Sequence, residues 1–446
     1  MTPDIVLSGV LIIGANDSLG LYRDKAFTQS KDRVYSELII RLFLGIHFMA
    51  IELSERVQRV KPSPTLAISA LAQQLKAEGR DVINLGVGQP DFQTPEHIKK
   101  AGIAAINDGN TGYTAVDGIP ELKDAIIKKF KRDNQLDYEA DQILVSCGGK
   151  QSFSNLCQAL LNEGDEVVIP APYWVSYPDM VLLAGGVPVI AEAGQEDNFK
   201  LTAEKLEAAI TDKTRLFVIN SPSNPTGVSY DFDELKALGE VLLKYPNIVV
   251  ATDDMYELIL FDNLTADRKR PFANILNATP ALNDRCLVLN GVSKAYAMTG
   301  WRIGYAAGPV EIIKGMKKIQ GQSTSNPTSI SQYAAVEALN GDQSCLVPML
   351  EAFKERHDYV VKALNEIDGV DCIESDGTFY VFPNVEGLIS RVDGVSTDAE
   401  LATHLLDKTG VALVPGSAFG LNGHIRLSFA TSMENLEQSI ERIASL

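Results

Sequence analysis

The sequence predicts an α/β fold: a seven-stranded, mostly parallel sheet with helices on both faces, plus a smaller α+β domain. From Val82 onward, short apolar runs alternate with amphipathic helical stretches, a pattern typical of a parallel sheet. Residues 216–219 are apolar at every position, as expected for a strand that is buried on both faces. A chain of 446 residues exceeds the size at which one hydrophobic core stops growing, so we expect two domains.

Seven short segments are expected to form the strands of the large sheet. Each is rich in apolar residues, and helical patterns lie between them. The stretch 231–244, for example, places Phe232, Leu235, Leu238 and Leu242 on one face of a helix. The expected strands are residues 143–146, 166–169, 187–191, 216–220, 247–252, 286–290 and 303–307.

The alternation of strand and helix patterns stops at residue 329, where a long helical pattern begins and runs to about residue 367. Beyond it lie two β-rich segments, residues 378–382 and 424–428. This mixture predicts a second, smaller domain, which the segment before about residue 95 would complete. We therefore expect an N-terminal extension (1–48), a small domain (49–95 with 341–446) and a large domain (96–340) that ends near Asn340.

The first 48 residues do not have the pattern of a targeting or membrane segment. The apolar run 5–15 lacks a basic leader, and the run 38–51 contains Arg41 and His47 and is too short to cross a bilayer. Five acidic and five basic residues balance each other in this stretch. Two explanations stay open: a real extension, or a start placed upstream of the true one, since Met49 directly precedes the recognisable body.

Charge and cysteine content exclude several kinds of partner. The formal net charge of −18 argues against nucleic acid or an anionic membrane as a partner. The five cysteines, at positions 147, 157, 286, 345 and 372, are scattered and match neither a disulfide framework nor a metal-binding spacing. We therefore expect no metal and a reducing, cytoplasmic location.

Glycines follow the first expected strand, at the sheet edge where ligands of parallel α/β proteins bind. Gly148 and Gly149 precede Lys150, and an apolar helical stretch starts at Phe153. Glycines at a helix N-terminus let backbone amides approach an anion. The motif indicates either a phosphate site or an ordinary tight turn between strand and helix.

Polar side chains follow two further strands. Asn224 lies in a loop fixed by two prolines and a glycine, which would aim its amide. Asp253 and Asp254 end the next strand, where a carboxylate is costly to bury unless it is paired, for example with a protonated ring nitrogen. Tyr256 could donate to a phenolate oxygen of the same ring. A plain proline loop and a helix-capping aspartate remain the alternatives.

Lys294 follows the strand at 286–290 in a loop of small residues. Such surroundings can lower the pKa of an amine and make it nucleophilic. Arg302, in the turn before the next strand, could bind a phosphate through two hydrogen bonds. A lone lysine is usually a solvated charge, but its spacing from Arg302 favours a site.

From about residue 52 to its end, the chain resembles the class I pyridoxal-phosphate-dependent aminotransferases, closely so the bacterial aspartate aminotransferases of the aspartate/prephenate branch. The most specific signature is Ser293-Lys294 followed by a Gly-x-Arg-x-Gly run around Arg302. The matching segments are residues 85–92, 113–120, 148–151, 172–177, 220–227, 253–256, 293–304 and 424–428.

The resemblance implies a fold-type I transferase with pyridoxal 5'-phosphate as cofactor. Lys294 would hold the cofactor as a Schiff base and then move a proton between the substrate Cα and the cofactor, while Asp253 would pair with the ring nitrogen. The resemblance also implies that Tyr256 and Asn224 bind the ring oxygen, that Trp174 stacks on the ring face and that Ser293 lies beside the cofactor. The phosphate would be bound by Gly149, Lys150, Arg302 and Tyr113 of the partner subunit. The substrate α-carboxylate would be bound by Arg426, Asn224, Trp174 and Gly88.

The resemblance also implies reversible transfer of the amino group from L-aspartate to 2-oxoglutarate in a ping-pong cycle, by a homodimer that acts on amino acids and 2-oxo acids. Lys150 is associated in this branch with the side-chain carboxylate of a dicarboxylic substrate, and Lys61 with prephenate, which would give arogenate. Two alternatives remain. One is another specificity on this fold, such as an alanine, aromatic or kynurenine transaminase or a lyase. The other is a cofactor-binding regulator, which would need an upstream DNA-binding segment that residues 1–48 do not supply.

Four positions depart from the family's pattern. Gln89 and Asp254 stand where glutamate is common, Met255 where isoleucine is common, and Pro64 where alanine is usual. None of them carries one of the expected chemical roles. Pro64, however, stiffens the segment that holds Lys61 and weakens the inference of prephenate as a substrate.

Overall fold

In the computed structural model of the chain, the described residues are 6–7, 10–13, 20–21, 51–264 and 272–446. The chain divides into two units, Met1–Ser54 and Glu55–Leu446. The described part of the first unit is a three-stranded antiparallel sheet of β1 (Val6–Leu7), β2 (Val10–Ile13) and β3 (Gly20–Leu21). Most of the expected N-terminal extension lies outside the described residues.

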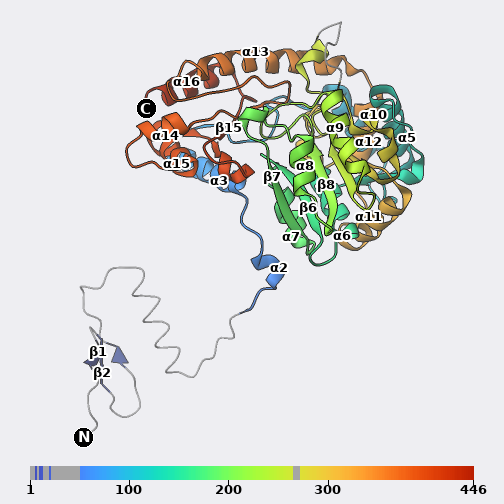
Figure 1. Cartoon of the computed structure of the whole chain (residues 1–446), viewed down its shortest axis with the longest axis horizontal. Coiled ribbons are helices and arrows are strands. Elements are labelled where there is room, and N and C mark those ends of the chain that lie inside the picture. Colours follow the sequence, from blue (N-terminus) through green and yellow to red (C-terminus); the bar gives the residue numbers. More distant parts are fainter. Residues whose placement is uncertain (1–5, 8–9, 14–19, 22–50, 265–271) are drawn as a thin grey trace. The chain divides into compact units, whose positions relative to one another are not determined.

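The second unit is built on a seven-stranded sheet with the order β5-β11-β10-β9-β8-β6-β7, of which Figure 1 shows β6, β7 and β8 side by side in green. β11 is antiparallel to both of its neighbours, and all other neighbouring pairs are parallel. The mostly parallel sheet is confirmed, since every expected segment overlaps one strand. The strands are β5 (Ile143–Ser146), β6 (Glu166–Ala171), β7 (Val187–Glu192), β8 (Thr214–Asn220), β9 (Val249–Asp253), β10 (Cys286–Gly291) and β11 (Gly304–Ala307).

Side chains of these strands alternate between two hydrophobic cores on opposite faces of the sheet. In β5, Ile143 and Val145 belong to one core and Leu144 to the other. This is why the strands are apolar at successive positions. The first core takes residues of α4 (Glu96–Asn107), α5 (Pro120–Lys129), α8 (Ala203–Ala209), α9 (Phe232–Leu243), α10 (Ile275–Ala278) and α12 (Ser329–Asn340), and the second takes residues of α6 (Gly149–Leu160), α7 (Tyr177–Leu183) and α11 (Val310–Ser323).

The helix expected at 231–244 is confirmed as α9, and its start is set by a capping box. The Asp231 side chain accepts a hydrogen bond from the Glu234 N–H (2.8 Å), and the Glu234 side chain accepts one from the Asp231 N–H (2.7 Å). Two backbone donors that would lack a partner in the first turn are thereby satisfied.

The long helical pattern expected from residue 329 to about 367 forms two helices. α12 ends at Asn340, and α13 (Leu346–Leu364) follows after a break. Gly341 is extended, and the Asp342 side chain accepts a hydrogen bond from the Ser344 N–H (2.9 Å). Aspartate competes with helix formation through such local bonds, which start a short 3-10 turn here.

The C-terminal part carries two small sheets. β12 (Tyr380–Val381), β15 (Ile425–Ser428) and β14 (Val414–Pro415) form an antiparallel sheet, which confirms strands within 378–382 and 424–428. β13 (Val411–Ala412) pairs in parallel with β4 (Ile83–Asn84), so the segment before residue 95 does join the C-terminal part. The division into domains near Asn340 stays a prediction. The other helices are α2 (Glu55–Gln58), α3 (Pro64–Ala77), α14 (Glu386–Arg391), α15 (Asp398–Thr409) and α16 (Met433–Ala444).

Candidate active site

The expected site residues gather at the carboxyl edge of the large sheet. β8 ends at Asn220, β9 at Asp253 and β10 at Gly291, and Asn220 lies opposite Asp253 in the ladder. Helix α6 begins at Gly149, three residues after β5 ends. Because parallel strands end at the same edge, the loops that follow them meet there.

Asp253 is a partly buried carboxylate with a tyrosine hydroxyl as its hydrogen-bond donor. The Tyr177 hydroxyl donates to Asp253 Oδ2 (2.5 Å), and the Met255 N–H donates to Oδ1 (3.3 Å). Burial raises the pKa of Asp253 to about 6, against the opposing effects of these hydrogen bonds and of the Lys294 charge. A cationic partner would hold this carboxylate in its ionised form.

Lys294 carries a charge opposite to that of Asp253, and it is also partly buried. Its Nζ donates to the Gly88 carbonyl oxygen (2.7 Å) and lies 5.9 Å from the centres of the Tyr256 and Phe379 rings. Burial lowers the pKa of Lys294 to about 8, with further lowering by nearby arginine charges. An amine with this pKa is partly unprotonated near neutral pH and can act as a nucleophile.

Arg426 is a buried guanidinium, 2% exposed, whose hydrogen-bond partners are neutral. It donates to Asn224 Oδ1 (2.9 Å) and to the Gly86 carbonyl oxygen (2.7 Å), while its Nε has no hydrogen-bond partner among the residues that the structure describes. The guanidinium also lies 4.5 Å from the centre of the Tyr380 ring and 4.9 Å from that of Phe419. A buried positive charge with a free donor favours binding of a carboxylate.

Arg302 and two glycines lie together at the start of α6. Arg302 donates to the carbonyl oxygens of Thr299 (2.8 Å) and Cys147 (3.2 Å), which hold its guanidinium beside Gly148. A Cβ on Gly148 would collide with that guanidinium, and one on Gly304 would collide with the backbone of Gly149. The glycines therefore let the Arg302 guanidinium lie directly beside the N-terminus of α6. A helix N-terminus and an arginine together are suited to bind an anion.

Trp174 and Lys150 lie together beside this edge. Lys150 Nζ is 5.2 Å from the centre of the Trp174 ring, which itself packs edge-on against Tyr177 at 5.2 Å and 90°. The pKa of Lys150 is lowered by burial and then by the Arg302 charge, and the Asp179 charge opposes this. The Lys150 amine and the Trp174 ring thus share one wall of the site.

Lys61 is exposed, and Asp179 connects it with Lys150. Burial raises the pKa of Asp179, while the backbone N–H of Lys61 and the charges of both lysines counteract it. The structure thus brings the two lysines expected to set specificity into the same neighbourhood.

Tyr256 is buried in the turn after β9. Its hydroxyl lies 3.2 Å from that of Tyr380, and a Cβ on Gly88 would come within 2.8 Å of the Tyr380 hydroxyl. Ser293 is buried beside Lys294 and its carbonyl oxygen accepts from the Met298 N–H (3.1 Å). Asn224 is also buried, and its N–H donates to Asn220 Oδ1 (2.8 Å).

Tyr113, which is expected to bind the phosphate of a neighbouring subunit, lies on the surface. Its side chain is 94% exposed. A bulky aromatic side chain so fully exposed is available to contact another molecule. Its expected role in a neighbouring subunit stays a prediction.

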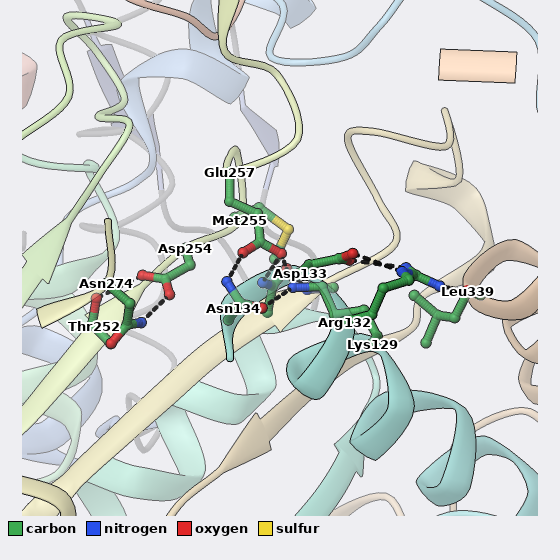
Figure 2. Close-up of polar contacts among 12 residues, drawn as sticks. Lys129, Arg132, Asp133, Asn134, Thr252, Asp254, Met255, Glu257, Asn274 and Leu339 are labelled. Atoms are coloured by element: carbon green, nitrogen blue, oxygen red, sulfur yellow. Dashed lines mark hydrogen bonds and ion pairs between the residues drawn. The ribbon is translucent and has the colours of Figure 1, made fainter. Parts of the chain in front are cut away.

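Asp254, although adjacent to Asp253, belongs to the protein interior. Figure 2 shows its carboxylate held by Thr252 and Asn274: the Thr252 hydroxyl donates to Oδ1 (2.6 Å), and the Asn274 amide donates to Oδ2. Burial and the Glu257 charge raise the pKa of Asp254 to about 8. The two adjacent aspartates therefore have separate surroundings.

Three residues of the site were missed by the sequence reasoning: Tyr177, Asp179 and Tyr380. The two tyrosines lie in apolar runs, and an aromatic residue in such a run is most simply taken as core. Tyr177 is the last residue of the matching segment 172–177, so its place in that motif was an available signal. Asp179 is an acidic residue in the first turn of α7, which alone indicates only helix stabilisation.

Three features bear on the compartment and metal expectations. In the residues that the structure describes, no helix is long and apolar enough to span a membrane. The same residues contain no cluster of three or more histidine, cysteine or acidic side chains that could hold a metal ion. All five cysteines are free.

Comparison with known proteins agrees with this geometry. Residues 80–443 match the family described as aminotransferase class I and II. An aspartate/prephenate aminotransferase of Nitrosomonas europaea is 59% identical over 401 residues, covering 89% of this chain and 100% of the relative. Another of that name, from Cereibacter sphaeroides, is 55% identical over 395 residues, covering 88% of this chain and 97% of the relative.

Solved structures give the same result. An aspartate aminotransferase from Rhizobium meliloti superposes with a TM-score of 0.85 at 48% identity, covering 89% of this chain and 98% of that one. The enzyme from Thermus thermophilus with maleate superposes with a TM-score of 0.82 at 40% identity, covering 89% and 100%. The expected fold-type I class and the resemblance are confirmed, and the chain belongs to the class I and II aminotransferases.

Proposed function

We propose that this chain is an aspartate aminotransferase that transfers the amino group of L-aspartate to 2-oxoglutarate with pyridoxal 5'-phosphate as cofactor. The observation that carries the proposal is the meeting of Lys294, Asp253 and Arg426 at one sheet edge. They supply an amine with a lowered pKa, a carboxylate that needs a cationic partner and a guanidinium with a free donor.

The donor set fits the cofactor. Asp253 is placed to pair with a protonated ring nitrogen, and Arg302 with the amides of Gly149 and Lys150 to bind a phosphate. Trp174 offers a ring face, and Tyr256, Asn224 and Ser293 offer polar groups near Lys294. When bound, the cofactor supplies an electron sink for the bonds of the substrate Cα.

The residues of the chain would do the rest of the chemistry. Lys294 has the lowered pKa that lets an amine attack a carbonyl and then hold or release a proton at the substrate Cα. Arg426 would bind the substrate α-carboxylate, with Asn224 fixing the guanidinium at 2.9 Å. The Gly88 carbonyl, 2.7 Å from Lys294 Nζ, would hold the free amine in place between steps.

We propose that specificity for a dicarboxylic substrate depends on Lys150, and that Lys61 contributes to the binding of prephenate. Lys150 lies over Trp174 on the wall of the site, and Asp179 lies near both lysines. The Thermus thermophilus relative was solved with maleate, a dicarboxylate, and the relatives above are named for aspartate and prephenate. The names of the relatives support the same two substrates here.

We further propose a homodimer in which Tyr113 of the partner subunit completes the phosphate site. The 94% exposure of Tyr113 supports this proposal. We also propose a cytoplasmic location, because the cysteines are scattered. The small domain is proposed to consist of residues 49–95 with 341–446.

A substrate panel tests this function. We expect the kcat/KM for aspartate and glutamate, with the complementary 2-oxo acid, to exceed that for alanine and phenylalanine by about 100-fold or more. Lys150→Leu should lower the value for aspartate by about 10- to 100-fold, the worth of one charge-assisted hydrogen bond, and leave alanine unchanged. A preference for alanine or phenylalanine would instead favour another transaminase specificity.

A further inference from the structure

A buried polar cluster lies behind the active site and includes an ion pair. Its members are Lys129, Asn134, Glu257 and Asn290, each at most 5% exposed. Figure 2 shows the first three with their polar ends together. Within the described part of the chain, no side-chain hydrogen bond or ion pair joins any of the four to a group proposed to bind cofactor or substrate.

Glu257 is the centre of this cluster, and both of its carboxylate oxygens are satisfied. Oε1 accepts from Lys129 Nζ and from Asn290 Nδ2 (2.8 Å). Oε2 accepts from Asn134 Nδ2 (2.6 Å), and Lys129 Nζ also donates to Asn134 Oδ1 (2.6 Å). Fully satisfied networks of this kind fix the positions of their members.

The cluster joins three segments, two of which carry the reactive groups. Glu257 lies in the turn after β9, four residues beyond Asp253. Asn290 lies in β10, four residues before Lys294, and its Oδ1 also accepts from the Gly291 N–H (2.7 Å). The third segment is the end of α5, which supplies Lys129, and the π-helical turn Phe130–Asn134 that follows it.

Stability alone is a poor explanation for such a cluster. A buried ion pair loses much of its attraction to desolvation, and apolar residues of similar volume often give equal or higher stability. What apolar residues cannot give is direction, because hydrogen bonds fix where each partner lies.

We propose that Glu257 is a positioning residue that, by binding Asn290 and Lys129, holds the turn that follows Asp253 in register with the strand that leads to Lys294. The inference rests on the proposed function, because it assigns Glu257 a part in keeping Asp253 and Lys294 correctly spaced for one cofactor. Glu257 itself touches neither cofactor nor substrate.

Glu257→Gln in the holoenzyme is the first test. The amide presents an N–H₂ group to neighbours that are all donors, which breaks at least one bond. We expect kcat for aspartate to fall about tenfold or more with little change in KM, since small misplacements of reacting groups act on the chemical step. Loosening the loops should also admit water to Lys294, so the pH midpoint of the bound-cofactor absorbance should rise by about one unit.

Asn290→Leu is the second variant, and it leaves the Lys129–Glu257 pair intact. It should shift kcat and the pH midpoint in the same direction by a smaller amount, and it decides the question if Glu257→Gln does not fold. The control is Tyr230→Phe, which removes a buried hydroxyl that accepts from the Leu201 N–H (2.6 Å) away from both loops. It should lower the thermal midpoint and leave the pH midpoint unchanged.

The inference is overturned if Glu257→Gln and Asn290→Leu behave like Tyr230→Phe, with lower thermal midpoints but an unchanged kcat and pH midpoint. The wild-type chain distinguishes this from failure of the proposed function. A wild-type holoenzyme without aspartate turnover would overturn both, whereas normal wild-type turnover with silent variants would overturn the positioning role alone.

Discussion

Asp253 and Lys294 are both shifted toward their neutral forms, because burial disfavours either charge. A pyridinium would restore the charged form of Asp253, and reaction with a carbonyl needs the neutral form of Lys294. The same burial therefore prepares one residue for pairing and the other for attack. Each shift gives a pH dependence that can be measured.

For Lys294, the rate constant of cofactor capture by the cofactor-free chain should rise with pH and level off above about pH 8. The neutral amine is the reactive form, and its pKa of about 8 means that little more is gained at higher pH. An unperturbed lysine, with a pKa of ~10.4, would keep gaining rate up to that pH. Stopped-flow absorbance at a series of pH values measures the profile, and a rise that continued to pH 10 would contradict the account.

For Asp253, Tyr177→Phe should lower activity most at the acidic end of the pH range. The Tyr177 hydrogen bond lowers the pKa of Asp253, so its loss raises that pKa above about 6 and protonates the carboxylate nearer to neutrality. We expect kcat/KM to fall about tenfold at pH 6.5 and less at pH 8.5. An equal loss at both pH values would point to general disruption, for which Tyr230→Phe is the control.

Arg426 offers the simplest test of substrate binding. Replacing Arg426 by lysine keeps the charge but removes the planar pair of donors. We expect kcat/KM for aspartate to fall about 100-fold or more, because charge-assisted hydrogen bonds contribute about 1.5–3 kcal/mol each. Steady-state kinetics of purified holoenzyme measure it. Retention of full kcat/KM would remove Arg426 from the α-carboxylate site.

At the scale of the elements, two variants can test whether Gly148, at the start of α6, is needed for cofactor binding. Gly148 and Gly164 both have φ near +90°, at +88° and +86°. A Cβ on Gly148 would meet Arg302, whereas one on Gly164 would meet no atom of the described residues within 4 Å. Both alanine variants carry the same backbone strain, so only Gly148→Ala should weaken cofactor binding, by about tenfold or more.

Titration of the two cofactor-free variants with pyridoxal 5'-phosphate, followed by absorbance, compares their dissociation constants. Similar values for Gly148→Ala and Gly164→Ala would mean that backbone strain, and not the space beside Arg302, governs binding. The thermal midpoints of the cofactor-free chains provide the measure of that strain.

The large sheet could be predicted because most of its strands are buried on both faces. Residues 216–219 are apolar at every position for that reason, and the order of motifs placed Asp253 and Lys294 at strand ends. The break between α12 and α13 was missed because Gly341 and Asp342 interrupt a pattern that is apolar on both sides. A single glycine inside a helical pattern is often tolerated. The hydrogen bond that the Asp342 side chain accepts is therefore what ends the helix here.

The supporting residues of the site could not be predicted in the same way. Tyr177 and Asp253 form a hydrogen bond although they lie 76 positions apart in the sequence, and Glu257 and Lys129 do so although they lie 128 positions apart. Such contacts depend on the register of neighbouring elements, which hydrophobic periodicity does not specify. Motif residues could be assigned from the resemblance, whereas their partners required the folded chain.

At the scale of the whole molecule, the proposed dimer makes a prediction about mixed subunits. If Tyr113 crosses to the partner site, Lys294→Ala and Tyr113→Ala chains, each weakly active alone, should regain activity when mixed and allowed to exchange. One site of each mixed dimer then has both residues, which gives about one quarter of wild-type activity. No gain above the separate variants, with exchange shown by differently tagged chains, would place Tyr113 in its own subunit's site or outside any site.

The most direct test of the central claim is a single-turnover experiment on purified holoenzyme, with Lys294→Ala beside it. Aspartate is added without a 2-oxo acid, and the absorbance of the bound cofactor is followed with time. The account predicts rapid conversion of the cofactor to its aminated form and release of one oxaloacetate per site, both abolished in Lys294→Ala. Equal conversion by the variant, or no conversion by the wild type, would contradict it.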